Sequence, residues 1–286
     1  EREIYKMNTI IIGELGINHG GNINIAKKLI DVCSDLNIPY VKFQKRDIET
    51  CYTKEFLDSS RESPWGNTQR AQKEGLEFSL EDYQEIDDYC NSKGNIGWFI
   101  SPWDVSSINF LLAFFPNMHY LKIPSAKVTD DVYLQKCKDS GFDLIMSTGM
   151  CDLSMVQKAV SSIVDSNKLK YLLACTSSYP CPTKDINLNQ IKFLSHYFRT
   201  PSCDIGYSDH SGGILFPALS VAYGAKMVEI HITLDRRMTG SDQASSIEPN
   251  GLRKLVKYIE EIELGLGEPN KSIQPSEIPI IAKLRG

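Results

Sequence analysis

Eight short apolar runs alternate with eight longer amphipathic segments along the chain, and this alternation limits the fold more than any other feature. The runs are rich in β-branched or aromatic residues with little period-two alternation, as expected of strands buried on both faces. They cover residues 9–16, 40–44, 96–101, 120–125, 143–148, 170–175, 204–208 and 226–232. The helix-like segments cover residues 22–36, 80–93, 105–114, 131–140, 153–165, 187–196, 213–223 and 249–266.

Eight strand–helix units at a spacing of about 30 residues predict an α/β protein with a (β/α)8 (TIM) barrel. A doubly wound open sheet is the alternative, but it needs no eighth strand and usually opens with a glycine-rich turn. Gly13, Gly16 and Gly20 do not form the G-x-G-x-x-G fingerprint of that turn. We therefore expect one catalytic barrel over residues 1–286, with a long loop insertion at about 47–77 after the second strand.

Charge and cysteine content exclude several classes of protein. Lys and Arg number 31 and Asp and Glu 36, a net charge of −5 that argues against nucleic-acid binding. No apolar run reaches the roughly 20 residues that span a bilayer, so no membrane partner is expected. The 8 cysteines include no Cys-x-x-Cys pair, which indicates reduced, mostly buried thiols in a cytoplasmic protein.

Two lysines and a series of hydroxyl groups lie where the predicted strands end, and a barrel carries its chemistry at that rim. Lys42 and Lys122 each lie between apolar neighbours within a strand, and buried lysines are costly unless paired. A single strand-end serine most often only caps the following helix. Two lysines together with a ring of Ser and Thr hydroxyls predict a site for phosphate or carboxylate.

Two histidines end adjacent predicted strands. Neighbouring strands lie about 4.8 Å apart, so His210 and His231 could share one metal ion. Glu229 points to the same side as His231, and Asp209 precedes His210. Two imidazoles with a carboxylate or water suit an open catalytic site for Mn, Mg, Fe or Zn. The residues alone thus predict metal-assisted chemistry between a carbonyl compound and a phosphorylated or carboxylated partner.

Nine short motifs closely resemble the sialic acid synthase family, in the order that the family keeps from about residue 10 to residue 286. The motifs are GELGINH (13–19), VKFQ (41–44), KIPS (122–125), STGM (147–150), CTSSYP (175–180), GYSDH (206–210), EIHIT (229–233), GSD (240–242) and SIEP (246–249). The resemblance implies a (β/α)8 barrel that condenses phosphoenolpyruvate with an N-acetylmannosamine-like sugar, free or phosphorylated. The products would be phosphate and a nine-carbon 2-keto sugar acid, either sialic acid or a related nonulosonic acid.

The resemblance also implies roles for individual residues. His210 and His231 would hold a divalent metal, usually Mn²⁺ or Mg²⁺, in a cytoplasmic homodimer. The catalytic residues would be Glu14, Glu229 and His231, and either glutamate could be the general base. The residues implied to bind phosphoenolpyruvate are Lys42, Ser101, Lys122, Ser125, Ser147, Ser208 and Ser177, the last at a position that is often Asn in relatives. The residues implied to contact the acceptor sugar are Gln44, Tyr179 and Asp242.

The sequence departs from the family pattern in two places. Lys127 stands where relatives commonly have an acidic residue that binds sugar hydroxyls, so it either pairs with an anionic sugar or points elsewhere. Many relatives continue into a C-terminal antifreeze-like domain that is exchanged within a dimer. No such domain is predicted in this chain, which ends at Gly286.

Three alternatives stay open. One is another metal-dependent, phosphoenolpyruvate-using synthase, such as one that makes an eight-carbon keto acid, although GYSDH makes this less favoured. The second is a class I aldolase with Lys42 or Lys122 as the Schiff-base residue. The third is a non-catalytic barrel that binds sugar or phosphoenolpyruvate. The combination of two lysines with two histidines argues against it, because a binding protein needs no metal beside its anion site.

Overall fold

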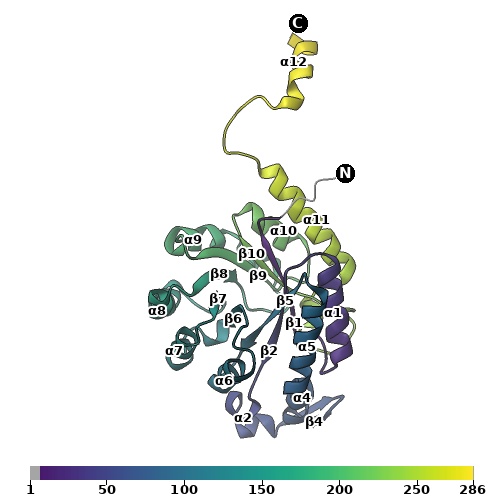
Figure 1. Ribbon diagram of the computed structural model, residues 1–286, viewed down its shortest axis with the longest axis vertical. Helices are drawn as coiled ribbons and strands as arrows, with labels where there is room; N and C mark the ends of the chain where they lie inside the picture. Colours follow the sequence, from purple (N-terminus) through teal and green to yellow (C-terminus); the bar gives the residue numbers. More distant parts are fainter. Residues whose placement is uncertain (1–6, 286) are drawn as a thin grey trace.

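Eight parallel strands close into a barrel in the computed structural model, which describes residues 7–285. The strand order around the barrel is β1–β10–β9–β8–β7–β6–β5–β2, and pairing of β2 with β1 closes the ring (Figure 1). The strands are β1 Ile10–Gly16, β2 Tyr40–Lys45, β5 Gly97–Pro102, β6 Tyr120–Ile123, β7 Asp143–Ser147, β8 Leu169–Cys175, β9 Asp204–Asp209 and β10 Met227–His231. The predicted (β/α)8 fold is confirmed, and the closed barrel excludes a doubly wound open sheet.

All eight predicted helices form in the segments that follow the strands, and several begin at side-chain caps. Asn22, Ser79 and Asp104 each accept hydrogen bonds from backbone N–H groups of the first turn, which satisfies donors that a helix start leaves unpaired. The helices are α1 Ile23–Asp35, α5 Leu80–Lys93, α6 Val105–Phe114, α7 Asp131–Asp139, α8 Leu153–Ile163, α9 Asn189–Phe198, α10 Leu215–Ala222 and α11 Pro249–Leu266.

The segment 47–77 is not the long loop that the sequence suggested. It contains the short helices α2 Ile48–Cys51, α3 Lys54–Leu57 and α4 Gln69–Leu76 and the hairpin β3 Ser60–Ser63 with β4 Gly66–Thr68. The hairpin turn packs on α4, because a Cβ atom at Gly75 would lie 2.1 Å from the Trp65 ring. The insertion lies after the second strand, as predicted, but it is folded rather than a loop. Four of its five elements have only three or four residues and carry almost no periodicity, so the sequence did not reveal them.

The interior of the barrel is layered by the pleat of its strands. The apolar layer consists of Ile12, Phe99, Tyr120, Ile145, Leu173 and Met227. Two residues further along the same strands stand Glu14, Ser101, Lys122, Ser147, Cys175 and Glu229. Because side chains repeat every second residue, this polar layer points into the same interior, closer to the C-terminal ends of the strands. The apolar layer therefore forms a solid floor beneath a polar one.

Beyond α11 the chain leaves the barrel, and a short helix, α12 Ile278–Arg285, lies apart from it (Figure 1). Residues 1–6 and 286 of the predicted barrel span lie outside the described residues. Within the described part of the chain, no helix is both long and apolar enough to cross a membrane. All eight cysteines are free thiols, and six of them are buried.

Candidate active site

One pocket at the C-terminal end of the barrel gathers nearly all the predicted site residues. It has a volume of about 170 Å³. The predicted residues that line it are Glu14, Lys42, Gln44, Ser101, Lys122, Ser125, Ser147, Ser177, Tyr179, Ser208, His210, Glu229 and His231. Asp242 does not line this pocket, but its carboxylate Oδ2 lies 3.6 Å from Nδ1 of His231.

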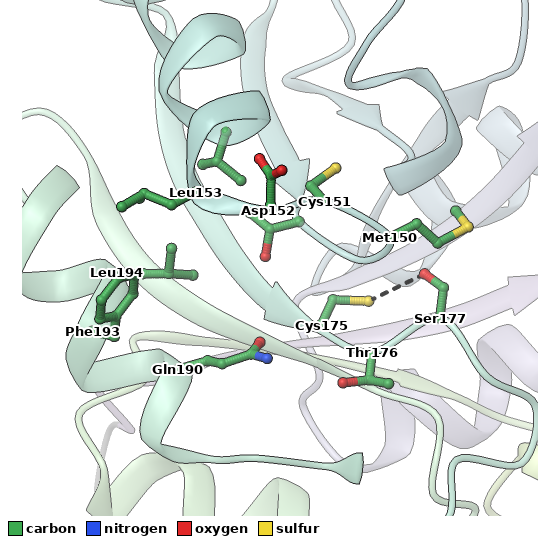
Figure 2. Close-up of a pocket in the computed structure, with 12 residues that line it drawn as sticks. Met150, Cys151, Asp152, Leu153, Cys175, Thr176, Ser177, Gln190, Phe193 and Leu194 are labelled. Atoms are coloured by element: carbon green, nitrogen blue, oxygen red, sulfur yellow. Dashed lines mark hydrogen bonds between the residues drawn. The ribbon is translucent and has the colours of Figure 1, made fainter.

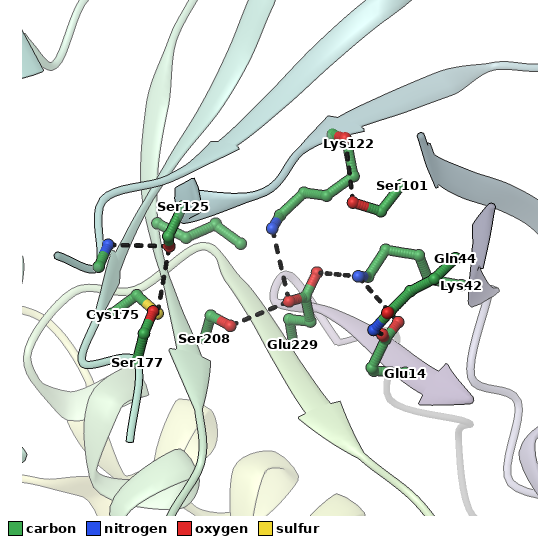
Figure 3. A network of polar contacts seen from close by, with 12 residues as sticks. Glu14, Lys42, Gln44, Ser101, Lys122, Ser125, Cys175, Ser177, Ser208 and Glu229 are labelled. Carbon is green, nitrogen blue, oxygen red and sulfur yellow. Dashed lines mark hydrogen bonds and ion pairs between the residues drawn. The ribbon is translucent and has the colours of Figure 1, made fainter. Parts of the chain in front are cut away.

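Two lysines and two glutamates form a buried charge cluster at the centre of the pocket (Figure 3). Lys42 Nζ lies 2.8 Å from Glu14 Oε2 and 3.6 Å from Glu229 Oε2. Lys122 Nζ lies 3.6 Å from Glu229 Oε1. Strand pairing creates the cluster, since Glu14 stands beside Lys42 in the β1–β2 register. The two positive and two negative charges compensate one another, and this pairing offsets the free-energy cost of burying the two lysines.

The cluster shifts the pKa values of its members in different directions. Burial lowers the pKa of Lys42, but Glu14 and Glu229 outweigh burial, and the net shift is upward. Burial also lowers the pKa of Lys122, and with Lys42 nearby the net shift stays downward despite Glu229. Burial would raise the pKa of Glu229, yet the two lysines bring it below its usual value. Glu229 is therefore an anion at neutral pH.

Serine hydroxyls surround the charge cluster, and some of them have hydrogen-bond partners whereas one has none. Ser208 donates to Glu229 Oε1 at 2.9 Å, and Ser101 donates to the carbonyl of Lys122 at 3.2 Å. Ser125 accepts from the N–H of Gly149 at 2.9 Å. Ser147 Oγ is buried without a hydrogen-bond partner among residues 7–285. A buried hydroxyl without a partner is costly, and an oxygen atom of a bound anion would satisfy it.

His210 and His231 end the adjacent strands β9 and β10, and their ring centroids lie 5.2 Å apart. His210 Nδ1 lies 2.8 Å from the carbonyl of Thr176, which leaves its Nε2 lone pair for another partner. Burial opposes protonation of His210, but Cys175 and the Thr176 carbonyl outweigh it and raise the pKa to about 9. The surroundings of this imidazole therefore favour positive charge.

The two imidazoles fit a divalent cation that takes its other ligands from substrate and water. Nδ1 of His231 is buried and has no hydrogen-bond partner among residues 7–285. The same part of the chain contains no group of three or more His, Cys, Asp or Glu side chains arranged for a metal ion. The protein would thus contribute two strong ligands and leave coordination positions open, as catalytic sites do. Tyr179 covers the pair, with its ring centroid 4.2 Å from that of His210.

Lys127 does not line the pocket. Its ammonium group pairs with Asp130 Oδ2 at 3.1 Å, three residues further along the chain. Of the two outcomes left open by the sequence, the structure favours the one in which this charge points elsewhere.

Trp103, Met150 and Cys175 also line the pocket and were not singled out from the sequence. Trp103 lies two residues after Ser101, and Cys175 lies two residues after Leu173. Since every second residue of a strand points to the same side, the sequence pattern could have identified both as pocket residues. Met150 carries no such signal, because its position depends on a left-handed backbone with φ of 60°.

A second, larger cavity of about 430 Å³ opens beside the first, between α8 and α9 (Figure 2). Met150, Cys175 and Ser177 line both cavities. The rest of its wall is largely apolar, with Leu153 and Phe193 among its residues. The catalytic pocket is therefore bounded on this side by a few small or flexible side chains.

Comparison of the sequence with known proteins identifies one family. The NeuB family model matches residues 29–271. The N,N'-diacetyllegionaminic acid synthase of Legionella pneumophila is 36% identical over 287 residues, covering 98% of this chain and 79% of the relative. The N-acetylneuraminate-9-phosphate synthase of Homo sapiens is 34% identical over 277 residues, covering 96% and 76%.

A solved structure agrees with these sequence matches. The N-acetylneuraminic acid (sialic acid) synthetase of Leptospira borgpetersenii, in complex with citrate, superposes with a TM-score of 0.83 at 33% identity. The match covers 100% of this chain and 96% of that one. The chain therefore belongs to the NeuB family of sialic and nonulosonic acid synthases, enzymes that condense phosphoenolpyruvate with a sugar to give a nonulosonic acid.

Proposed function

We propose that this enzyme joins phosphoenolpyruvate to the open-chain aldehyde of an N-acetylmannosamine-like sugar, with a divalent cation, Mn²⁺ or Mg²⁺, bound by His210 and His231. The products are a nine-carbon 2-keto sugar acid and phosphate. The observation that carries the proposal is the presence of two buried lysines and two adjacent imidazoles in one pocket. An anion site directly beside a cation site suits the union of an anionic donor with a carbonyl acceptor.

Lys42 and Lys122 bind the phosphate and carboxylate groups of phosphoenolpyruvate in this proposal. Without that ligand their charges are compensated by Glu14 and Glu229. A bound trianion would attract both ammonium groups and release the glutamates from them. Ser147, whose hydroxyl has no partner among residues 7–285, would donate to an oxygen of the anion. Ser101, Ser125, Ser177 and Ser208 would complete the cradle.

The reaction then proceeds in two stages. C3 of phosphoenolpyruvate attacks C1 of the acceptor, forming the carbon–carbon bond, and the aldehyde oxygen takes a proton to become a hydroxyl. Water adds to the cationic C2 and gives up a proton to a glutamate. The bond between C2 and the phosphate oxygen breaks, the C2 hydroxyl loses its proton, and a ketone and phosphate remain. The bound divalent cation would supply polarisation of the acceptor carbonyl.

Glu14 and Glu229 are both candidates for the base that takes the proton from water. Glu14 Oε1 accepts from the amide of Gln44 at 2.7 Å, which ties it to an expected acceptor contact. Glu229 lies between both lysines, and their charges lower its pKa, so it is a weak base until phosphoenolpyruvate draws the lysines away. Gln44, Tyr179 and Asp242 would orient the acceptor above the donor.

The test is a phosphate-release assay with phosphoenolpyruvate and a panel of acceptors. The panel contains N-acetylmannosamine, its 6-phosphate, mannose and a 2,4-diacetamido sugar, each with Mn²⁺, with Mg²⁺ and with EDTA. We expect release with at least one N-acetylated sugar and its loss in EDTA. Release that continues unchanged in EDTA would refute the metal assignment, and no release with any acceptor would refute the acceptor class.

A Schiff-base aldolase is the second candidate, because Lys122 is a buried lysine that lines the pocket and its pKa is lowered by burial and by Lys42. Borohydride reduction during turnover distinguishes the two chemistries. A covalent adduct on Lys122, found by mass spectrometry, would favour the aldolase. An unmodified lysine together with activity lost to EDTA would favour the metal-dependent synthase.

A further inference from the structure

Asn18 lies just beyond the C-terminal end of β1 and is only 1% exposed, yet it does not line the catalytic pocket. Its amide Nδ2 donates to the carbonyl of Ile232 at 2.8 Å and to Oγ of Ser246 at 2.7 Å. These two partners stand at either end of the segment 233–245, which connects β10 to α11 and carries Asp242. One buried amide therefore ties the end of β1 to both ends of that segment.

A relay of two hydrogen bonds, through the Ser246 hydroxyl, connects Asn18 to the backbone of Asp242. The hydroxyl accepts from Nδ2 of Asn18 and donates to the main-chain carbonyl of Asp242 at 2.6 Å. The side chain of Asp242 in turn places Oδ2 3.6 Å from Nδ1 of His231. Asn18 can thus influence the site without touching it, by fixing the position of Asp242.

The side chain of Gln243 holds the same segment from inside the protein. It is buried, and its Nε2 donates to the main-chain carbonyl of Asn18 at 3.3 Å. Its Oε1 accepts from the hydroxyl of Thr233, which is buried as well. Asn18 therefore contacts the segment with its side chain and with its backbone, and one of these contacts is made to the residue that directly follows Asp242.

Backbone pairing by itself does not fix Asp242. Beyond the end of the segment, the N–H of Ile247 donates to the carbonyl of His231 at 2.8 Å. Residues 239–241, which precede Asp242, are exposed and belong to no strand or helix. Exposed stretches without regular structure open easily, so the buried side-chain contacts decide where the carboxylate of Asp242 stands.

We propose that Asn18 is a positioning residue, which holds the Asp242 carboxylate beside His231 for the acceptor sugar. The inference rests on the proposed function, in which Asp242 orients the acceptor. An amide is required at this position because it donates two hydrogen bonds, whereas a carboxylate of the same size only accepts them. In Asn18→Asp the Ser246 hydroxyl would turn to the new carboxylate and release the carbonyl of Asp242, and the carbonyl of Ile232 would lose its donor.

Hydrogen exchange of the full chain, followed by mass spectrometry, tests whether Asn18 holds the segment. Residues 245–247 each donate their N–H to a main-chain carbonyl, so their exchange rate reports opening. Asn18→Asp should speed this exchange about tenfold or more. Asn95→Asp is the matched control, because Asn95 Nδ2 also donates to a carbonyl, that of Ser34, but lies just before β5 at the opposite end of the barrel. Unchanged exchange at 245–247 in Asn18→Asp overturns the proposal, whatever the activity.

A kinetic double-mutant cycle tests whether the effect runs through Asp242. The acceptor is the N-acetylated sugar that supports the fastest phosphate release. Asn18→Asp should raise the KM for this acceptor about tenfold and change the KM for phosphoenolpyruvate by less than about twofold. Asp242→Ala should also raise the acceptor KM, and Asn18→Asp should then add little, because both changes remove the same contact. Asn95→Asp should leave both constants unchanged.

Multiplied effects of Asn18→Asp and Asp242→Ala on the acceptor KM would contradict the proposal, because they would show that Asn18 acts independently of Asp242. Ser246→Ala tests the same relay with a milder change, since only one hydroxyl is removed. It should likewise speed exchange at 245–247 and raise the acceptor KM, with the fold verified by circular dichroism. A wild-type acceptor KM in Ser246→Ala would exclude the relay.

The outcomes separate this inference from the proposed function. No phosphate release by the wild type with any acceptor would overturn the proposed reaction, and faster exchange in Asn18→Asp would still show that Asn18 holds the segment. Phosphate release by the wild type, together with multiplied effects in the cycle, would leave the reaction standing and overturn the positioning role.

Discussion

Glu14 and Glu229 hold the charges of Lys42 and Lys122 inside the barrel, so the residues proposed for catalysis are also the counter-ions of the fold. Removing one partner of a buried ion pair leaves an uncompensated charge, which costs far more than the loss of a surface pair. Stability and chemistry are therefore coupled in this cluster, and a stability measurement can report on it without any substrate.

Glu229→Gln should destabilise the protein at neutral pH by about 3 kcal/mol, because two buried lysines lose a shared carboxylate. The pKa of Glu229 is lowered in the folded state, so its contribution is fully present above its ordinary value of 4.5. That contribution is lost as the pH falls through the lowered pKa. The difference in Tm between wild type and variant, followed by calorimetry, should therefore shrink as the pH is taken below 4.5.

Glu261→Gln is the control for this experiment. Glu261 is exposed and pairs with Lys257 at 3.5 Å one turn away on α11. An exposed pair of this kind contributes at most about 0.5 kcal/mol, so Tm should hardly change. A Glu229→Gln deficit that stays constant down to pH 3 would show that the lysines are not compensated by this carboxylate.

His210→Ala and His231→Ala should each abolish metal-dependent turnover and weaken Mn²⁺ binding at least about tenfold, because each would remove one of two protein ligands. Metal binding is measured by calorimetry, and retention of the fold by circular dichroism. His196→Ala should bind Mn²⁺ as the wild type does, since His196 is exposed on α9. Wild-type activity of either site variant in a chelated buffer would disprove the metal assignment.

Among the elements, β9 carries a glycine that packs tightly against both neighbouring strands. A Cβ atom on Gly206 would lie 2.5 Å from Leu173 Cδ2 and 2.6 Å from the carbonyl oxygen of Met227. Gly206 thus makes room for a residue of the apolar floor beneath the site. The strand cannot approach β8 and β10 this closely with any larger residue at that position.

Gly206→Ala should destabilise the barrel by about 1–3 kcal/mol through overpacking, measured as a lower Tm. Gly265→Ala is the matched control, because the same methyl group on α11 meets no atom within 4 Å. That change should be neutral or stabilising by up to about 1 kcal/mol, since Ala favours a helix over Gly. An unchanged Tm in Gly206→Ala would mean that β9 shifts freely, against the close packing of the floor.

At the scale of the whole molecule, the barrel ends with α11, and α12 makes little contact with it. Ile278, Ile280 and Leu284 of α12 are 61%, 52% and 74% exposed. A segment that buries so little apolar surface contributes little to the stability of the barrel. The homodimer implied by the family resemblance stays a prediction.

Deletion of residues 268–286 should therefore leave the barrel folded, with Tm changed by no more than about 1 °C. Differential scanning calorimetry measures the stability of the full and shortened chains. Sedimentation of both chains tests the predicted dimer in the same samples. A fall in Tm of several degrees would show that α12 is packed in solution, against its own barrel or against another copy.

The sequence was sufficient to predict the barrel because the signal for it is local and repeated. Each strand carries its own apolar run, and each helix its own periodicity, so eight units could be counted without knowing any contact. Most of the proposed site followed for the same reason. Because side chains repeat every second residue along a strand, Glu14 lies above Ile12 and Lys122 above Tyr120. The parallel strands of a barrel all end at the same face, so the residues at their C-terminal ends come together.

Only the tertiary structure decided which charges meet and which donors stay unpaired. The pairing of Lys42 with Glu14 depends on the β1–β2 register, and the pairing of Lys122 with Glu229 depends on the closed barrel. The stack of Arg46 on Trp103 joins residues far apart in the chain, and the docking of Trp65 on Gly75 turns a presumed loop into a small folded unit. Periodicity is a property of neighbours in sequence, whereas ion pairing, stacking and hydrogen-bond saturation are properties of neighbours in space.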